Sequence, residues 1–449
     1  MTPLGPPLGD GAALSEPLPE APSDAYARRI GSEAHALVER LYPFCRSLTG
    51  DGVRQTFRAL QDVLPIEVLE VPTGSRAFDW TVPDEWNIED ACVLDDSGRR
   101  VIDFRANNLH VAGYSARIEA RISRAELLQH LFTIPSRPDD IPYRHFYYRD
   151  GWAFCAPHRL LSDLKDAEYR VLIKSTIKPG SLTYGEFFIP GSSDAEILFS
   201  THTCHPSLCN DNLSGIVTTA LLARELGRFP QRFGMRFLFV PATLGPLVWL
   251  SRNEQLVPRI RAGLVIAGVG DRGAPTYIKS RNGHAPIDRA MLHVLQHTGA
   301  KDARIREFAP VGYDQRQYCS PGFDLPLGCF MRTPDGEYPE YHTSADDLSF
   351  ITATSLGGSW EVVRLATAIV QTDRRYRNNY PKGEPRLGAR GLLEDAARLG
   401  MFWTLNFSDG NHGLLDIAER SRVPFWSILE GARRLEACGL LTAIDDDEQ

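Results

Sequence analysis

The chain of 449 residues lacks the features of several common protein classes. It has no run of about 18 or more apolar residues, so we expect no membrane-spanning helix. Its first residues lack the basic and apolar regions of a signal peptide. The formal net charge is −8 and the pI is near 5.9, which gives no basic surface for nucleic acid. We therefore predict a cytoplasmic protein with no nucleic-acid or membrane partner.

The eight cysteines are scattered and have none of the paired spacing of a zinc finger. A chain of this length also has no need of a disulfide framework. Cys204 and Cys209 bracket His205, and we interpret both as small buried packing residues. The hydrophobic fraction of 43% is ordinary for a globular protein, and the length predicts two or three domains.

One short segment carries most of the chemical information. The run 200–215 follows an apolar stretch that predicts a buried strand, and it precedes a helical pattern at 216–226. It contains His202, His205 and Asp211. These side chains are therefore expected on a loop at the carboxyl end of a strand, where open α/β sheets build their sites.

A second segment, 337–348, supplies the further ligand that such a site needs. It contains His342 between flanking carboxylates. Neutral imidazole and carboxylate suit a zinc-like ion. We therefore predict one divalent metal ion, zinc, bound by His202, His205, Asp211 and His342. The alternative is that these histidines only form hydrogen bonds within their loops.

The remaining sequence predicts several units. Residues 1–24 are rich in Pro, Gly, Ala and Ser and predict a disordered tail, followed by a helix at 32–48. Alternating patterns over 72–157 predict an inserted β-rich domain. Strands and helices alternate over 25–71 and 158–379, which predicts an α/β domain with a mixed sheet flanked by helices. Its expected strands are 170–174, 196–200, 235–241 and 262–267, and its expected helices are 213–227, 246–255, 286–298 and 354–372.

The C-terminal residues 386–449 follow a plausible linker at 380–385 and form a compact helical unit. Helix, turn, helix and short strand over 413–441 are the outline of a winged helix. Its second helix mixes acidic and basic residues and its tail is acidic, so DNA binding is unsupported. We expect an interaction role, with a homo-oligomer formed through this unit or through the β-rich domain.

These segments also resemble a known family. The strings at 204–207, 210–215, 314–322 and 337–348 are similar to a bacterial aminopeptidase-like family that was long catalogued as a domain of unknown function. The resemblance covers residue 30 to the end. It implies a zinc-exopeptidase α/β domain of the phosphorylase/hydrolase-like type, an inserted β-rich domain and a C-terminal winged helix. It implies fold more firmly than reaction.

The parent zinc aminopeptidases imply roles for single residues, and this chain departs from them. His202, Asp211 and His342 match the family's metal ligands, and His205 competes with His202. The peptidases have consecutive glutamates, a general base and a ligand, where this chain has Ala242 and Thr243. The aspartate expected after the next strand is missing from 265–269. A mononuclear site is therefore expected.

Without a glutamate at 242, the proton shuttle must come from another carboxylate. The candidates are Glu337, Glu340 and Asp314. Glu340 could instead orient His342, and Asp346 or Asp347 could do the same or cap the next helix.

Substrate contacts are expected from the loop after Asp314 and from the segment around His342. The candidates are Arg316, Gln317, Tyr318 and Tyr341. Arg316 could bind a substrate carboxylate in a bidentate pair. An internal ion pair to Asp314 or Asp324 is an equal alternative for Arg316, and aromatic packing is the alternative for Tyr341 and Tyr338.

Three functions remain open from the sequence. The first is a metal-dependent hydrolase of the aminopeptidase type acting on an amide or peptide-like bond of a small-molecule or peptide-like substrate. The second is a biosynthetic enzyme that uses the same fold for amide transfer or condensation. The third is a catalytically silent metal-binding or assembly module.

Overall fold

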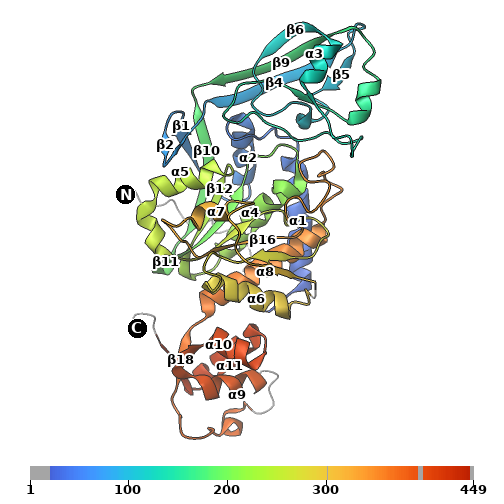
Figure 1. Cartoon of the computed structure of the whole chain (residues 1–449). Coiled ribbons are helices and arrows are strands. Elements are labelled where there is room, and N and C mark those ends of the chain that lie inside the picture. Colours follow the sequence, from blue (N-terminus) through green and yellow to red (C-terminus); the bar gives the residue numbers. More distant parts are fainter. Residues whose placement is uncertain (1–20, 301, 393–397, 445–449) are drawn as a thin grey trace.

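The computed structural model describes residues 21–300, 302–392 and 398–444. A β-rich insert, an α/β domain and a helical C-terminal domain follow one another along the long axis of the molecule (Figure 1). The tail predicted for 1–24 falls mostly outside the described residues. Helix α1 begins at Asp24, where the Ser23 side chain accepts a hydrogen bond from the Tyr26 amide.

A mixed eight-stranded sheet forms the centre of the α/β domain. Strands β12, β11, β13 and β16 are parallel, and β10 and β14 flank them in the opposite direction. In the order of the sheet, the strands are β1 (Glu67–Pro72), β10 (Ser181–Ile189), β12 (Gln231–Val240), β11 (Gly191–His202), β13 (Ile260–Ile266), β16 (Leu327–Met331), β14 (Thr276–Ile278) and β15 (Arg304–Arg306). The strands expected at 196–200, 235–241 and 262–267 are confirmed as β11, β12 and β13.

Helices cover both faces of this sheet. Alternate residues of β11 enter opposite cores, Ile197 and Phe199 on one face and Leu198 on the other. The core that contains Ile197 and Phe199 includes the helices α1 (Asp24–Leu41), α4 (Gly215–Leu226), α6 (Pro286–His297) and α8 (Ala353–Thr372). The core that contains Leu198 includes α5 (Leu244–Arg252) and α7 (Gln315–Tyr318). Helix α2 (Asp51–Gln61) packs against β10. The four α/β helices expected from the sequence are confirmed. The first helix ends at Leu41, before Pro43, and α2 was not expected.

The β-rich insert stands on the edge of the sheet at which β1 ends and β10 begins. Its four-stranded sheet consists of β5 (Arg100–Asp103), β4 (Glu85–Leu94), β9 (Glu168–Lys178) and β6 (Ile118–Ser123). Short elements accompany it, namely the hairpin β2 (Arg76–Ala77) and β3 (Trp80–Thr81), helix α3 (Arg124–Gln129), and β7 (Leu131–Phe132) with β8 (Phe154–Cys155). The strand predicted at 170–174 lies in β9 and pairs with β4 and β6. The insert therefore extends to Lys178, and the predicted boundary at 157 is wrong.

The C-terminal domain has the helices and strands of a winged helix. Its elements are β17 (Arg375–Asn378), α9 (Arg398–Phe407), β18 (Asp409–Gly413), α10 (Leu414–Ser421), α11 (Phe425–Ala437) and β19 (Leu441–Ile444). Strand β17 pairs with both β18 and β19, so the domain begins before the predicted boundary at 386. In the described part of the chain, no helix is long and apolar enough to cross a membrane.

Candidate metal centre

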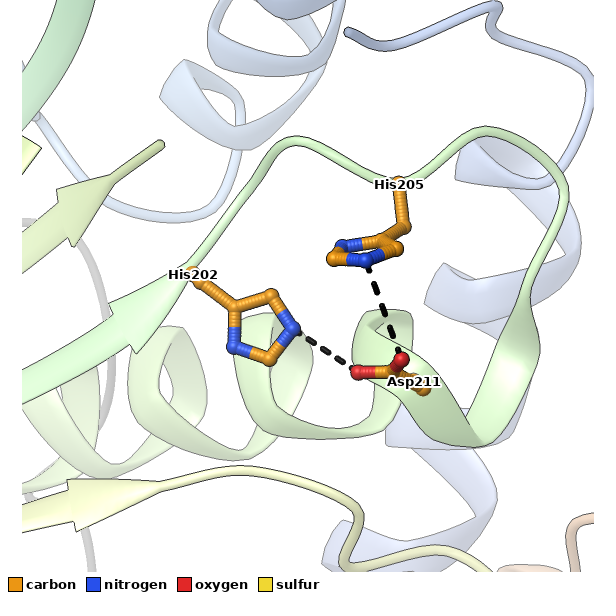
Figure 2. Close-up of side chains that lie close together, drawn as sticks. All are labelled: His202, His205 and Asp211. Carbon is orange, nitrogen blue, oxygen red and sulfur yellow. Dashed lines mark hydrogen bonds and ion pairs between the residues drawn. The ribbon is translucent and has the colours of Figure 1, made fainter. Parts of the chain in front are cut away.

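The predicted ligands lie where the central strand of the sheet ends. His202 is the last residue of β11, and His205 follows on the connecting loop. Asp211 lies in the segment Cys209–Ser214, which leads into α4, and its own backbone is not helical (φ −110°, ψ 80°). Figure 2 shows both imidazoles pointing toward the Asp211 carboxylate. The strand, the loop and the segment before α4 therefore bring His202, His205 and Asp211, which are close in sequence, to one point.

His342 completes this cluster from a distant part of the chain. Its Nε2 atom lies 3.0 Å from Oδ2 of Asp211, whereas Nε2 of His202 lies 2.8 Å from Oδ1. Nε2 of His205 lies 3.8 Å from Oδ2. His342 has a φ of 54°, in the left-handed region that bulky residues rarely adopt. The three imidazoles and one carboxylate are called the histidine cluster below.

Burial and mutual proximity fix the charges in the histidine cluster. Burial would raise the pKa of Asp211, but the imidazoles of His205, His202 and His342 hold that pKa well below its usual value. Burial lowers the pKa of His205 well below its usual value, and neighbouring imidazoles add to this effect against the opposing charge of Asp211. The cluster therefore contains an ionised carboxylate and a neutral imidazole at neutral pH, which are the forms that bind metal ions.

A buried network holds Asp211 in place. The Asp346 carboxylate accepts hydrogen bonds from the backbone amides of Asn210 (2.6 Å) and Asp211 (2.9 Å). Burial nevertheless raises the pKa of Asp346 to about 8. The Asn210 side chain donates to Asp271, and its oxygen accepts from the amide of Gly270. Asp346 thus positions the Asp211 loop, rather than orienting His342 or capping α8.

Aromatic rings enclose the histidine cluster. Tyr313 stacks on His202 with ring centroids 5.3 Å apart, and Tyr341 stacks on His342 at 3.9 Å. The ring of Tyr143 lies 5.1 Å from both His205 and His342. These contacts limit the access of water to the imidazoles.

Tyr143 belongs to the β-rich insert, which thereby contributes directly to the site. Its backbone amide donates to the carbonyl of His342 at 2.8 Å, and the Ser344 amide donates to the carbonyl of Ile141 at 2.8 Å. The Tyr143 and Tyr147 hydroxyls lie 2.8 Å apart. Sequence reasoning missed Tyr143, Tyr147 and Tyr313. The dense run of aromatic and basic residues at 143–148 was the available signal.

Among the three carboxylates considered as proton shuttles, Asp314 has the properties that this role requires. It is fully buried, and neither of its oxygens has a hydrogen-bond partner among the described residues. Burial raises its pKa to about 6, while the charges of His202 and Arg316 lower it and that of Asp211 raises it. A buried carboxylate without partners is costly to the fold, and such groups are typical of functional sites.

Ala242 lies at the same edge of the sheet as His202. Val240, the last residue of β12, pairs with His202 in the parallel register, and Ala242 follows two residues later. The thiol of Cys204 is 3.7 Å from the Ala242 carbonyl and 3.5 Å from Nδ1 of His205. Cys204 and Cys209 are buried, as expected. Ala242 thus lies beside the loop that carries Cys204 and His205, and its side chain carries no base.

Two predicted site residues have other roles in the structure. Glu337 forms ion pairs with Arg304 (3.1 Å) and Arg306 (2.6 Å), which engage both of its oxygens at the surface. Tyr318 is fully buried, and its hydroxyl lies 2.9 Å from Oγ of Ser200. The Tyr318 hydroxyl is engaged by Ser200 in the core and the Glu337 carboxylate by two arginines at the surface, so these two assignments are corrected.

The other predicted residues lie around the site without a direct role in the cluster. Glu340 is 3.9 Å from Arg137 of the insert, and its carbonyl accepts from the Thr343 hydroxyl. Arg316 and Gln317 are partly exposed residues of α7, directly after Asp314. Their position keeps them available as substrate contacts. Tyr341, by contrast, is engaged by the ring of His342.

The sheet and the helices that flank it have the fold of zinc aminopeptidases. A zinc aminopeptidase from Bacillus subtilis superposes with a TM-score of 0.54 at 14% identity, covering 76% of this chain and 94% of that one. An aminopeptidase from Aneurinibacillus sp. strain AM-1 gives a TM-score of 0.50 at 12% identity, over 77% and 95% of the two chains. Identities this low show the common fold alone.

The chain belongs to the family described as domain of unknown function DUF4910, which matches residues 35–373. A winged helix-turn-helix family matches residues 374–443. A protein of Clostridium acetobutylicum is 42% identical over 422 residues, 92% of this chain and 97% of that protein. It is named "Putative polysaccharide biosynthesis protein with aminopeptidase-like domain". A crystal structure from Clostridium acetobutylicum superposes with a TM-score of 0.90 at 42% identity, over 94% and 98% of the chains.

Proposed function

We propose that this protein is a metal-dependent hydrolase of an amide or peptide-like bond that uses one divalent ion, zinc. The observation that carries the proposal is the convergence of three imidazoles on one buried, ionised carboxylate at the carboxyl end of β11. Burying a carboxylate costs free energy unless it is paired or coordinates a metal, and the imidazoles around Asp211 supply the further donors that a metal ion needs.

The donor set of the cluster fits a zinc ion. Zinc prefers imidazole nitrogen and carboxylate oxygen, and His202, His205 and Asp211 can each direct one ligand atom within 4.8 Å of the others. His342 adds a fourth donor. Asp211 and His342, with His202 or His205, would hold the ion. The ion would polarise the scissile carbonyl and lower the pKa of a bound water.

The chain's own residues would supply the rest of the chemistry. Asp314 would accept the proton that the attacking water loses and return it to the leaving amine, since its pKa of about 6 is close to neutral. Tyr143, Tyr313 and Tyr341 would exclude bulk water from the cluster. Arg316 and Gln317 would bind polar groups of the substrate from α7.

A single ion is favoured over a pair. Ala242 and Thr243 offer no carboxylate beside His202, and Asp271 is committed to Asn210, Gly273 and Thr333. No further carboxylate among the described residues joins His202, His205 and Asp211 as a metal-binding group. The cluster therefore supplies ligands for one ion.

The hydrolase proposal is tested by metal content and by turnover. Protein purified without a histidine tag is analysed for metal and assayed with aminoacyl-4-nitroanilides and N-acyl amino sugars. We expect about one zinc ion per chain and amide hydrolysis that chelation abolishes and zinc restores. Failure to bind zinc even when it is supplied would refute the proposal and leave a silent scaffold.

A second candidate is a biosynthetic enzyme that transfers or condenses amides. It is supported by Ala242, because a reaction that must avoid water benefits from losing the water-activating glutamate, and by the biosynthetic name of the Clostridium relative. The two candidates differ in what a carboxylate at position 242 would do.

Replacing Ala242 with glutamate is expected to increase hydrolysis of aminoacyl-4-nitroanilides by about 10-fold or more, because a positioned base contributes on the order of 10²–10⁴ in rate. Ala242→Gln is the matched control, since it adds the same volume without a base. Initial rates of the zinc-loaded proteins give the comparison. An equal gain in both variants would reject the base, and loss of a native transfer activity in Ala242→Glu alone would favour the second candidate.

A further inference from the structure

Exposed aromatic side chains gather where the insert meets the α/β domain. Phe78 is 41% exposed, Trp80 44% and Tyr148 51%. Trp80 and Tyr148 meet edge to face with centroids 5.5 Å apart, and Phe78 meets the partly buried Phe323 in the same way at 5.5 Å. These four residues, which come from three separate segments, are called the aromatic rim.

The topology places the aromatic rim at the edge of the sheet that carries the histidine cluster. Strand β10 is antiparallel to both β1 and β12, so β1 and β12 run in the same direction. Because β12 is parallel to β11, β1 also runs in the direction of β11. The β2–β3 hairpin therefore leaves β1 at the edge where His202 ends β11. The hairpin packs against α5, which begins directly after Ala242 and Thr243 (Figure 1).

The other two segments also connect to the site. Tyr148 follows Tyr147, whose hydroxyl contacts that of Tyr143 beside His205 and His342. Phe323 lies five positions after Tyr318, at the end of the loop that begins with Asp314 and α7. All three segments of the rim are thus continuous with segments that form the site.

The backbone of the rim indicates function rather than folding. Phe78 has a φ of 56° and Tyr148 a φ of 61°, in the left-handed region that bulky residues rarely adopt. Such conformations cost on the order of 1–3 kcal/mol each. Burial does not offset this cost, because both rings are exposed. Exposed apolar side chains that gather into one patch mark interaction sites.

Carboxylates alternate with these rings. In the sequence, Asp79 lies between Phe78 and Trp80, and Asp150 lies two positions after Tyr148. Asp324 follows Phe323 and forms an ion pair with Arg281 at 2.8 Å. Flat aromatic faces pack against the C–H faces of a pyranose, and carboxylates accept hydrogen bonds from its hydroxyl groups. A protein partner would instead favour an apolar centre without interspersed carboxylates.

We propose that the aromatic rim binds the saccharide part of a substrate whose amide bond enters the histidine cluster. This inference rests on the proposed function and specifies its substrate class as amide-bearing saccharides. The exposed ring of Trp80 offers a face to a pyranose, and the ring of Tyr148, inclined at 64° to it, forms a side wall. Phe78 and Phe323 extend the rim toward the loop that carries Asp314. The rim positions the substrate and takes no part in bond cleavage.

Binding of neutral oligosaccharides tests the rim directly. Chitotetraose, cellotetraose and maltotetraose are titrated against the full chain, with tryptophan fluorescence and calorimetry as readouts. We expect at least one of them to bind, and Trp80→Ala to weaken that binding by about 10-fold or more. Tyr380→Ala is the matched control, because Tyr380 is 50% exposed and lies in the C-terminal domain, after β17. Its variant should bind as the native protein does.

Tyr148→Ala provides a second variant in case the first one misfolds, and circular dichroism establishes that both are folded. The inference is overturned if none of the three tetrasaccharides binds, or if both rim variants bind as tightly as the native chain. It is also overturned if Trp80→Ala converts a dimer to a monomer in sedimentation without affecting saccharide binding, which would make the rim an interface. Zinc content is measured on the same samples. Zinc bound without saccharide binding refutes the rim alone, whereas saccharide binding without zinc refutes the hydrolase.

Discussion

Asp211→Asn is expected to abolish zinc binding. Asp211 is the acceptor at the centre of the histidine cluster, 2.8 Å from His202 and 3.0 Å from His342. An asparagine keeps the size of the side chain and removes its charge, so the ion would lose its only anionic ligand. Because loss of outer-shell partners already costs about 10–100-fold in metal affinity, we expect a loss of at least about 100-fold. Metal content after dialysis and competition with a zinc indicator measure it.

Asp347→Asn is the control for this experiment. Asp347 lies on the same loop as Asp346 but is partly exposed, and its carboxylate accepts hydrogen bonds from the amide and hydroxyl of Ser349. This variant should retain the native zinc content. Zinc should raise the unfolding temperature of the native chain and of Asp347→Asn, but not that of Asp211→Asn, because only ligands bound to the folded state stabilise it. Full zinc occupancy in Asp211→Asn would refute the proposed ligand set.

The sequence was sufficient to predict the local half of the site. His202, His205 and Asp211 lie within ten residues, and a strand, a loop and a helix with clear periodicity fix their arrangement. His342 could be added because its own motif carries the chemistry of a ligand. Asp314 could be named because it lies in a polar loop, and the structure adds that it is buried without partners.

The remaining part of the site depends on contacts between distant segments. Tyr143 reaches the cluster only because the insert pairs with the His342 loop, through backbone groups that have no sequence pattern. Tyr318 and Glu337 were misassigned because composition does not say which way a side chain in a loop or a short helix points. Strand β9 was assigned to the wrong sheet for a similar reason, since alternation predicts a strand but not its neighbours.

Asp314→Asn is expected to lower the turnover of amide substrates by about 10²–10⁴ while leaving zinc content unchanged. Asparagine cannot accept the proton of the attacking water, and Asp314 is not part of the group His202, His205 and Asp211, whose ligand atoms lie within 4.8 Å of one another. Initial rates and metal analysis on the same preparation separate the two roles. The fold should tolerate the change, because it removes a buried ionisable group whose oxygens have no partners among the described residues.

Glu337→Gln is the control for the Asp314 experiment, because Glu337 was also a candidate for the proton shuttle. The Glu337 carboxylate is held by Arg304 and Arg306, so its loss should leave turnover within about 2-fold of native and affect only these two exposed ion pairs. A loss of zinc in Asp314→Asn would make Asp314 a ligand rather than a shuttle. Native turnover in Asp314→Asn, together with a large loss in Glu340→Gln, would transfer the shuttle to Glu340, which lies two residues before His342 and near Arg137.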